Sequence, residues 1–140
     1  MTPAIHRSLT VERRYPAPPA RVFRALSDPA RKRRWFAEGE GFEIESYTLD
    51  FREGGFERTR FRPAGGPPMT NDCVYLEIVR EERVIFAYAM TIDGKPLSSS
   101  LGVMELVAEP AGTLLRYIDT GAQENWSITL RDFAVRPLEL

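Results

Sequence analysis

The stretch Pro16-Ala-Pro-Pro-Ala-Arg-Val-Phe-Arg-Ala-Leu-Ser-Asp-Pro29 decides the fold of this chain. Its first prolines end a strand, because proline cannot donate to a ladder of backbone hydrogen bonds. Pro19 suits the first turn of a helix, where its missing N–H costs nothing. Apolar residues then recur at helical spacing, which predicts a short amphipathic helix over residues 19–27. These apolar residues are Val22, Phe23 and Leu26.

A second short helix follows the first directly. Asp28 is a good N-cap and Pro29 a good first helical residue, so together they end one helix and begin the next. We expect this second helix to run to about residue 36, with Trp35 and Phe36 on its apolar side. Two short helices cannot bury their own apolar faces, so the bent arm must pack against a sheet.

Strands are expected on both sides of this arm. Residues 5–15 alternate loosely and predict a half-buried strand, placed at a sheet edge because it opens the chain. After residue 42, alternating segments and short turns predict further strands that are mostly antiparallel. Gly54-Gly55 supplies the positive backbone φ that the first of these turns needs. The expected strands cover residues 42–49, 56–62, 73–79, 83–91, 99–109 and 114–119.

The end of the chain supports two interpretations. Trp126, Leu130 and Phe133 recur at helical spacing, which favours a closing helix over residues 125–136. Alternation of Trp126, Ile128 and Leu130 is also compatible with a strand. We favour the helix.

Length, charge and hydropathy narrow the classes of function that the chain could have. The chain has 140 residues, enough for a single domain over residues 1–140. Its net charge of −1 gives no basic excess, so we do not expect a nucleic-acid partner. No apolar run approaches the ~20 residues that a membrane span needs, and no signal segment is evident. We therefore expect no membrane association and a cytoplasmic location.

Several motifs in order resemble one known family. They are residues 14–18, 22–29 and 35–36, the turn at 50–55, the strand segments 75–79 and 83–86, and residues 112–115. The chain resembles the START-like, birch-pollen-allergen-type fold of the SRPBCC superfamily. Within it, the match is to the branch similar to the activator of the heat-shock chaperone ATPase. The resemblance covers roughly residues 8–120.

The resemblance implies an α+β helix-grip fold. In that fold a curved antiparallel sheet of about six to seven strands wraps around a C-terminal helix, with an apolar cavity between them. This chain departs from the family at its end, where at most about a dozen residues fit a helix. A shortened helix would leave an apolar sheet face exposed, and such a face usually meets a ligand or a partner. A homodimer is therefore possible.

Few residues have an obvious catalytic or metal-binding pattern. His6 is the only histidine and lies near the N-terminus. No cluster of His, Asp, Glu or Cys has metal-ligand spacing, so we expect no metal site, and no cofactor. Cys73, the only cysteine, lies in an apolar strand and is expected to be a buried small hydrophobe.

A group of aromatic and methionine residues is the best candidate for a binding site. Each could simply be core, but the mixture also suits a cavity with a few orienting polar groups. An inward Arg60–Glu105 pair would orient a ligand carbonyl or carboxylate, whereas the alternative puts both charges on the outer face in water. The candidate lining residues are Trp35, Phe36, Phe42, Phe56, Arg60, Tyr75, Phe86, Tyr88, Met90, Met104 and Trp126.

Three functions follow as hypotheses. The first is a protein that binds a hydrophobic or aromatic small molecule between sheet and helix. The second is a cyclase- or hydrolase-type enzyme on the same fold, for which no obvious base is present. The third is a chaperone ATPase regulator, which rests on the family resemblance alone.

Overall fold

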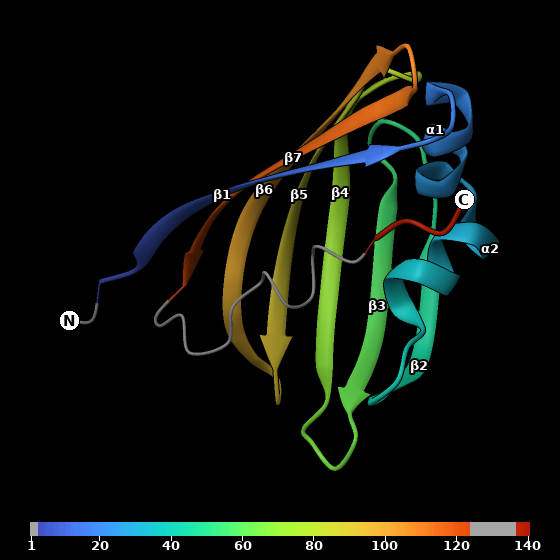
Figure 1. Cartoon of the computed structure of the whole chain (residues 1–140). Coiled ribbons are helices and arrows are strands. Elements are labelled where there is room, and N and C mark those ends of the chain that lie inside the picture. The colour runs from blue at the N-terminus through green and yellow to red at the C-terminus, as the bar shows by residue number, and fades with distance from the viewer. Residues whose placement is uncertain (1–2, 124–136) are drawn as a thin grey trace.

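Within residues 3–123 and 137–140, the part of the chain that the computed structural model describes, seven antiparallel strands form one curved sheet (Figure 1). The strand order is β1-β7-β6-β5-β4-β3-β2, so β1 and β2 are the edges. The strands are β1 (Ile5–Tyr15), β2 (Phe42–Leu49), β3 (Phe56–Pro63), β4 (Met69–Val79), β5 (Arg83–Ile92), β6 (Lys95–Glu109) and β7 (Gly112–Gln123).

A short helical arm links β1 to β2 and packs against one end of one face of the sheet, called the inner face below (Figure 1). The arm consists of α1 (Pro19–Ser27), α2 (Pro29–Lys32) and the π-helical turn η1 (Arg33–Ala37). Asp28 caps α2 by accepting a hydrogen bond from the backbone N–H of Arg31 at 3.0 Å. The Trp35 indole N–H donates to the carbonyl oxygen of Ala25 at 2.8 Å, which ties η1 back onto α1.

The predicted α+β helix-grip architecture is confirmed, including the edge position of the first strand. Three strands are longer than predicted by four residues or more: β4 begins at Met69, β6 begins at Lys95 and β7 runs to Gln123. The apolar alternation used for the prediction fades in these extensions, because polar side chains occupy inner-face positions there. The expected helix over residues 125–136, with Trp126, lies outside the described residues.

The interior consists of two apolar clusters. One joins the arm to β6 and β7 through buried residues such as Leu26, Trp35 and Leu115. The other lies over β3, β4 and β5 and includes Tyr75 and Met90. Phe23 and Met104 pack against both clusters.

The last described residues return to the arm. Leu138 is buried in the cluster that contains Trp35, and its backbone N–H donates to the Tyr15 hydroxyl at 3.1 Å. This contact places the C-terminus beside the helices, as Figure 1 shows.

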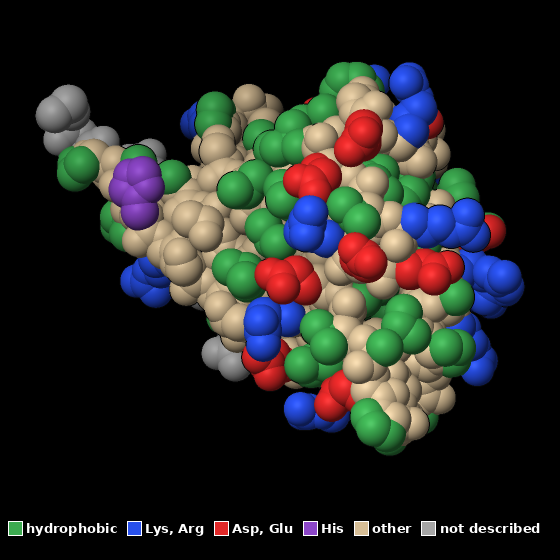
Figure 2. Space-filling model, turned by 90° about the horizontal axis from the view of Figure 1, so that it is seen from above, with side chains coloured by type: hydrophobic (Ala, Val, Ile, Leu, Met, Phe, Trp, Pro, Cys, Tyr) green, Lys and Arg blue, Asp and Glu red, His purple; other side chains and the backbone are tan. Residues whose placement is uncertain are grey.

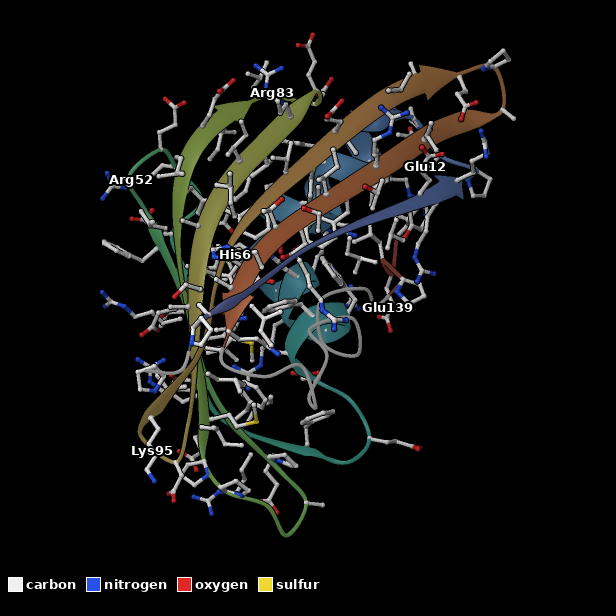
Figure 3. The ribbon with its side chains drawn as sticks, turned by 90° about the vertical axis from the view of Figure 1, so that its left-hand side faces the viewer. His6, Glu12, Arg52, Arg83, Lys95 and Glu139 are labelled. Carbon is white, nitrogen blue, oxygen red and sulfur yellow. The ribbon has the colours of Figure 1, made fainter. Side chains whose placement is uncertain are left out.

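The outer face of the sheet carries cross-strand ion pairs. Arg60 pairs with Asp72 at 2.7 Å and Arg62 with Glu45 at 3.1 Å. Acidic and basic side chains are interspersed on the surface seen in Figure 2, and Arg52, Arg83 and Lys95 lie around the rim of the sheet in Figure 3. No helix among the described residues is long and apolar enough to cross a membrane.

The structure does not contain the inward Arg60–Glu105 pair, because Arg60 pairs with Asp72 instead. Thr59 and Phe61 occupy buried inner positions, so Arg60 between them must face outward, where it pairs with Asp72. Glu105 lies on β6, which β4 and β5 separate from β3, and it is opposite Arg83 and Arg116. The charges therefore lie on the outer face, the alternative that the sequence left open.

Candidate functional site

One pocket lies between the helical arm and the inner face of the sheet. It encloses about 810 Å³ of space free of protein atoms, its opening to solvent included. Its walls are mostly aromatic and sulfur-containing, with a few polar groups. The lining residues are Lys32, Trp35, Phe36, Ala37, Phe42, Glu57, Thr59, Phe61, Asn71, Cys73, Phe86, Tyr88, Met90, Met104 and Tyr117.

The structure brings most of the candidate residues from the sequence to this pocket. Those that line it are Trp35, Phe36, Phe42, Phe86, Tyr88, Met90 and Met104. Tyr75 is fully buried just behind the wall, where its hydroxyl contacts Lys32 and Glu57. Phe56 is 47% exposed and Arg60 pairs with Asp72 on the outer face, so neither belongs to the pocket. Trp126 lies outside the described residues.

A buried ion pair forms part of the pocket wall. Lys32 of α2 donates to Glu57 Oε1 of β3 at 2.8 Å, and the two residues are only 6% and 4% exposed. Tyr75 donates to the same oxygen at 3.0 Å, while Tyr47 donates to Glu57 Oε2 at 2.5 Å. The carboxylate thus accepts three hydrogen bonds, which offset the cost of burying its charge.

Aromatic rings surround the Lys32 ammonium. Its Nζ lies 4.9 Å from the centre of the Phe36 ring, and Trp35 and Tyr75 follow at 6.0 and 5.8 Å. Ring faces attract cations, and more strongly where water is excluded. The ion pair and the rings therefore hold a positive charge at the pocket wall beside apolar surface.

A second buried carboxylate, Asp119, lies on the same inner face of the sheet, beside the part of the pocket wall that β5 and β7 form. Tyr88 of β5 and Tyr117 of β7 both donate to Asp119 Oδ2, the latter at 2.5 Å. Burial raises the pKa of both phenols, and the Asp119 carboxylate raises the pKa of each further. Both phenols therefore stay protonated and keep donating to Asp119 at neutral pH.

Gly102 shapes the same region. It lies directly opposite Phe86 on the neighbouring strand, and a Cβ at this position would overlap the Phe86 ring. The missing side chain lets the ring lie over β6 and stack on Tyr117, with the ring centres 6.2 Å apart and the planes 6° from parallel. In this position the Phe86 ring forms part of the pocket wall.

Cys73 is buried in the pocket wall, as the sequence predicted. Burial raises the pKa of its thiol to about 12, and the nearby Glu57 carboxylate adds to the rise. The thiol is therefore neutral at physiological pH and a poor nucleophile. No group of three or more His, Cys, Asp or Glu residues in the described part of the chain could hold a metal ion.

Sequence reasoning did not single out the polar lining residues. Lys32 and Glu57 are missed because each resembles a surface charge until the arm folds over β3. Glu57, Thr59 and Phe61 alternate along their strand, which puts them on one side of it, and this alternation identifies the inner face. Asn71 precedes residues 73–79, the predicted strand, so the sequence pattern gives it no place on the inner face.

Comparisons with known proteins agree with this architecture. A solved structure from Rhizobium leguminosarum is 39% identical, with a TM-score of 0.83 over 86% of this chain and 80% of its own. One from Rhizobium loti is 38% identical, with a TM-score of 0.82 over 93% and 88% of the two chains. One from Chromobacterium violaceum is 29% identical, with a TM-score of 0.65 over 81% and 78%. No curated protein matches the chain.

A family model points to the same group of proteins. The model described as "Activator of Hsp90 ATPase homolog 1-like protein" matches residues 16–132, which is most of the chain. The match begins at the proline-rich stretch that opens the helical arm, and it includes the strands that form the pocket. The chain therefore belongs to the family of proteins similar to the activator of Hsp90 ATPase homologue 1, within the START-like SRPBCC superfamily.

Proposed function

We propose that this protein binds an apolar, aromatic small molecule in the pocket between the helical arm and the sheet, and that it does so in the cytoplasm. The observation that carries the proposal is the pocket itself, whose wall is made mostly of aromatic and methionine side chains. Small-molecule sites are typically apolar with a few placed polar groups. Here the Lys32–Glu57 pair supplies such groups.

Lys32 gives the pocket a means of orienting its ligand. Its ammonium has three N–H donors, and Glu57 Oε1 and Tyr75 accept from two of them at 2.8 and 3.2 Å. A ligand carbonyl, hydroxyl or carboxylate beside Phe36 would accept from the third. The aromatic walls would hold the body of the ligand, and Lys32 would fix its polar end.

Native mass spectrometry of the protein purified from its host tests this proposal. The expected result is an additional bound mass that disappears on denaturation. Met104→Trp should fill the pocket and abolish the bound mass, because Met104 lines it. Leu101→Trp, on the outer face of the same strand, should retain the bound mass. Wild-type protein with no bound mass and no affinity for added aromatic compounds would refute the proposal.

An enzyme of the cyclase or hydrolase type is a second candidate. The observation that favours it is that Tyr88 and Tyr117 line the pocket and share the buried Asp119 carboxylate. A phenol in such a pocket can donate a hydrogen bond to a substrate oxygen on which negative charge develops. Screening aromatic esters and polyketide-like substrates should then reveal turnover that Tyr88→Phe abolishes while binding persists.

Regulation of a chaperone ATPase is a third candidate function, and it rests on the description of the matching family model, which names an activator of the Hsp90 ATPase. Such a role would act through a protein-binding surface. The feature that carries our proposal is an internal pocket, so small-molecule binding ranks first. A chaperone ATPase assay with added protein tests the regulatory role directly.

A further inference from the structure

Two buried polar atoms stand side by side on the floor of the pocket. Thr59 of β3 is 3% exposed, and its Oγ1 has no hydrogen-bond partner among the described residues. Asn71 of β4 lies directly opposite Thr59 in the sheet register, and its Oδ1 also has no such partner. Both residues line the pocket.

Leaving such atoms unpaired is costly for a protein. A buried polar group without a partner keeps its desolvation penalty, so native structures retain few of them. The surrounding wall is apolar: Met90 lies opposite Asn71 on β5, and Phe61 follows Thr59 on the inner face of β3. Here two unpaired polar atoms come from directly opposite residues on adjacent strands, and both residues line the same pocket.

The register sets what could satisfy both atoms. Directly opposite residues of an antiparallel pair have Cβ atoms about 4.5–5.5 Å apart, so one ligand atom can reach both side chains. Asn71 Oδ1 is an acceptor and needs a donor, whereas the Thr59 hydroxyl can donate or accept. A hydroxyl group is the simplest partner, because it donates to Asn71 while it accepts from Thr59.

The remaining walls define the body of the ligand. Phe42 and Phe61 meet edge to face with centres 5.9 Å apart, and the Phe86 ring stacks on the Tyr117 ring. Flat rings stack well on such surfaces. We propose that Thr59 and Asn71 form a hydroxyl-binding subsite and that the natural ligand is a phenol, an aromatic ring system bearing a hydroxyl group. This inference rests on the proposed function, namely that the pocket binds an aromatic molecule.

Three matched probes test the subsite on the full-length protein: 2-naphthol, naphthalene and 2-methoxynaphthalene. The methoxy compound keeps the oxygen acceptor but has no donor for Asn71. Wild type should bind 2-naphthol about tenfold more tightly than either other probe, the effect expected of one or two added hydrogen bonds. Affinities follow from probe fluorescence or calorimetry.

The near-isosteric double variant Thr59→Val/Asn71→Leu removes both polar atoms. Its preference for 2-naphthol should fall to within about twofold, while naphthalene binds as well as before or better. Thr48→Val, at an exposed position on the adjacent strand β2, is the matched control and should keep the full preference. In the ligand-free protein, Thr59→Val should also raise the melting temperature, because it removes an unpaired buried hydroxyl.

The outcomes separate the two proposals. Equal affinity of wild type for all three probes, or a preference that survives in the double variant, would overturn the subsite and leave aromatic binding intact. Failure of all three probes to bind would count against the binding function itself, and the subsite would fall with it. A hydroxyl preference lost only in the double variant would establish both.

Discussion

The buried pair of Lys32 and Glu57 is the residue-scale feature with the largest expected energetic effect. Both side chains lie at or below 7% exposure, so solvent screens them little. Lys32→Met would leave the Glu57 carboxylate buried without its cation, although Tyr47 and Tyr75 would still donate to it. We expect a loss of about 3–5 kcal/mol in unfolding free energy, measured by urea denaturation.

Two controls show whether that loss comes from an uncompensated charge. Lys32→Met/Glu57→Gln removes both charges and keeps an acceptor for the tyrosines, so it should recover much of the stability. Arg60→Met breaks the half-exposed Arg60–Asp72 pair and should cost less than about 1 kcal/mol. Equal losses in the single and double variants would mean that packing, and not charge, dominates.

Cys73 should make stability fall at alkaline pH. Burial raises the pKa of its thiol from 9.0 to about 12 in the folded chain. Below pH 9 the thiol is protonated in both states, whereas between about pH 9 and 12 the unfolded chain loses the proton and is favoured. This group then removes up to about 1.4 kcal/mol of stability per pH unit.

The measurement compares wild type with Cys73→Val across that pH range. Buried tyrosines with raised pKa values act in the same direction in both proteins, so only the difference between the two profiles reports Cys73. The gap should change in favour of the variant as pH rises. Parallel profiles would show that the thiol titrates alike in both states.

At this scale, sequence patterns recover apolar lining residues better than polar ones. Tyr88, Met90 and Met104 were identified because a strand packed on one face must bury such residues. Glu57 and Lys32 were not, because an isolated charge in a strand or helix is usually solvated. The two residues are 25 positions apart in the sequence, and they meet only when the arm folds over β3.

At the scale of elements, Gly102 determines how β5 and β6 frame the pocket. Gly102→Ala would place a methyl group where the Phe86 ring now lies, since the two residues are directly paired. The ring must then move away from Tyr117 toward the pocket. We expect a loss of about 1–3 kcal/mol in stability together with weaker ligand binding, checked by thermal unfolding and probe fluorescence.

A compensating variant separates this mechanism from a general strain on β6. Gly102→Ala/Phe86→Leu gives the new methyl group room, so part of the stability and of the binding should return. If the second substitution adds its own loss with no recovery, the two sites do not couple and the ring is not displaced.

Elements were predictable where the hydrophobic period is uninterrupted. Pro19, Asp28 and the spacing of the apolar residues predict the helical arm correctly. The start of β4 was missed because Asn71 occupies an inner position where the pattern calls for an apolar side chain. Asn71, the polar residue that interrupts the apolar pattern of β4, is also part of the proposed hydroxyl subsite.

On the scale of the whole molecule, homodimer formation stays a prediction. It came from the short C-terminal segment available to cover the sheet. Native mass spectrometry or analytical ultracentrifugation at micromolar concentration would show twice the chain mass if it is correct. A single-chain mass at every concentration would refute it.

The pocket lies between the two apolar clusters, so a bound ligand would contact both. Its walls come from both apolar clusters: Trp35 and Phe36 from the arm side, and Phe61 and Met90 from the sheet side. A bound aromatic molecule would therefore add contacts between the arm and the sheet. A ligand that binds only the folded state stabilises it by about 2.7 kcal/mol at a free concentration one hundred times Kd.

Amide hydrogen exchange would locate that stabilisation. Without ligand, residues 19–37 should exchange faster than the central strands, because the helices of the arm are short and their local opening would break no strand pairing of the sheet. Saturating 2-naphthol should slow exchange in the arm more than in β1, which lies at the far edge and lines no part of the pocket. The pocket-filled variant Met104→Trp should show slow arm exchange without any ligand. Uniform slowing across the chain would mean that the ligand stabilises only against global unfolding, and that the arm and sheet already open together.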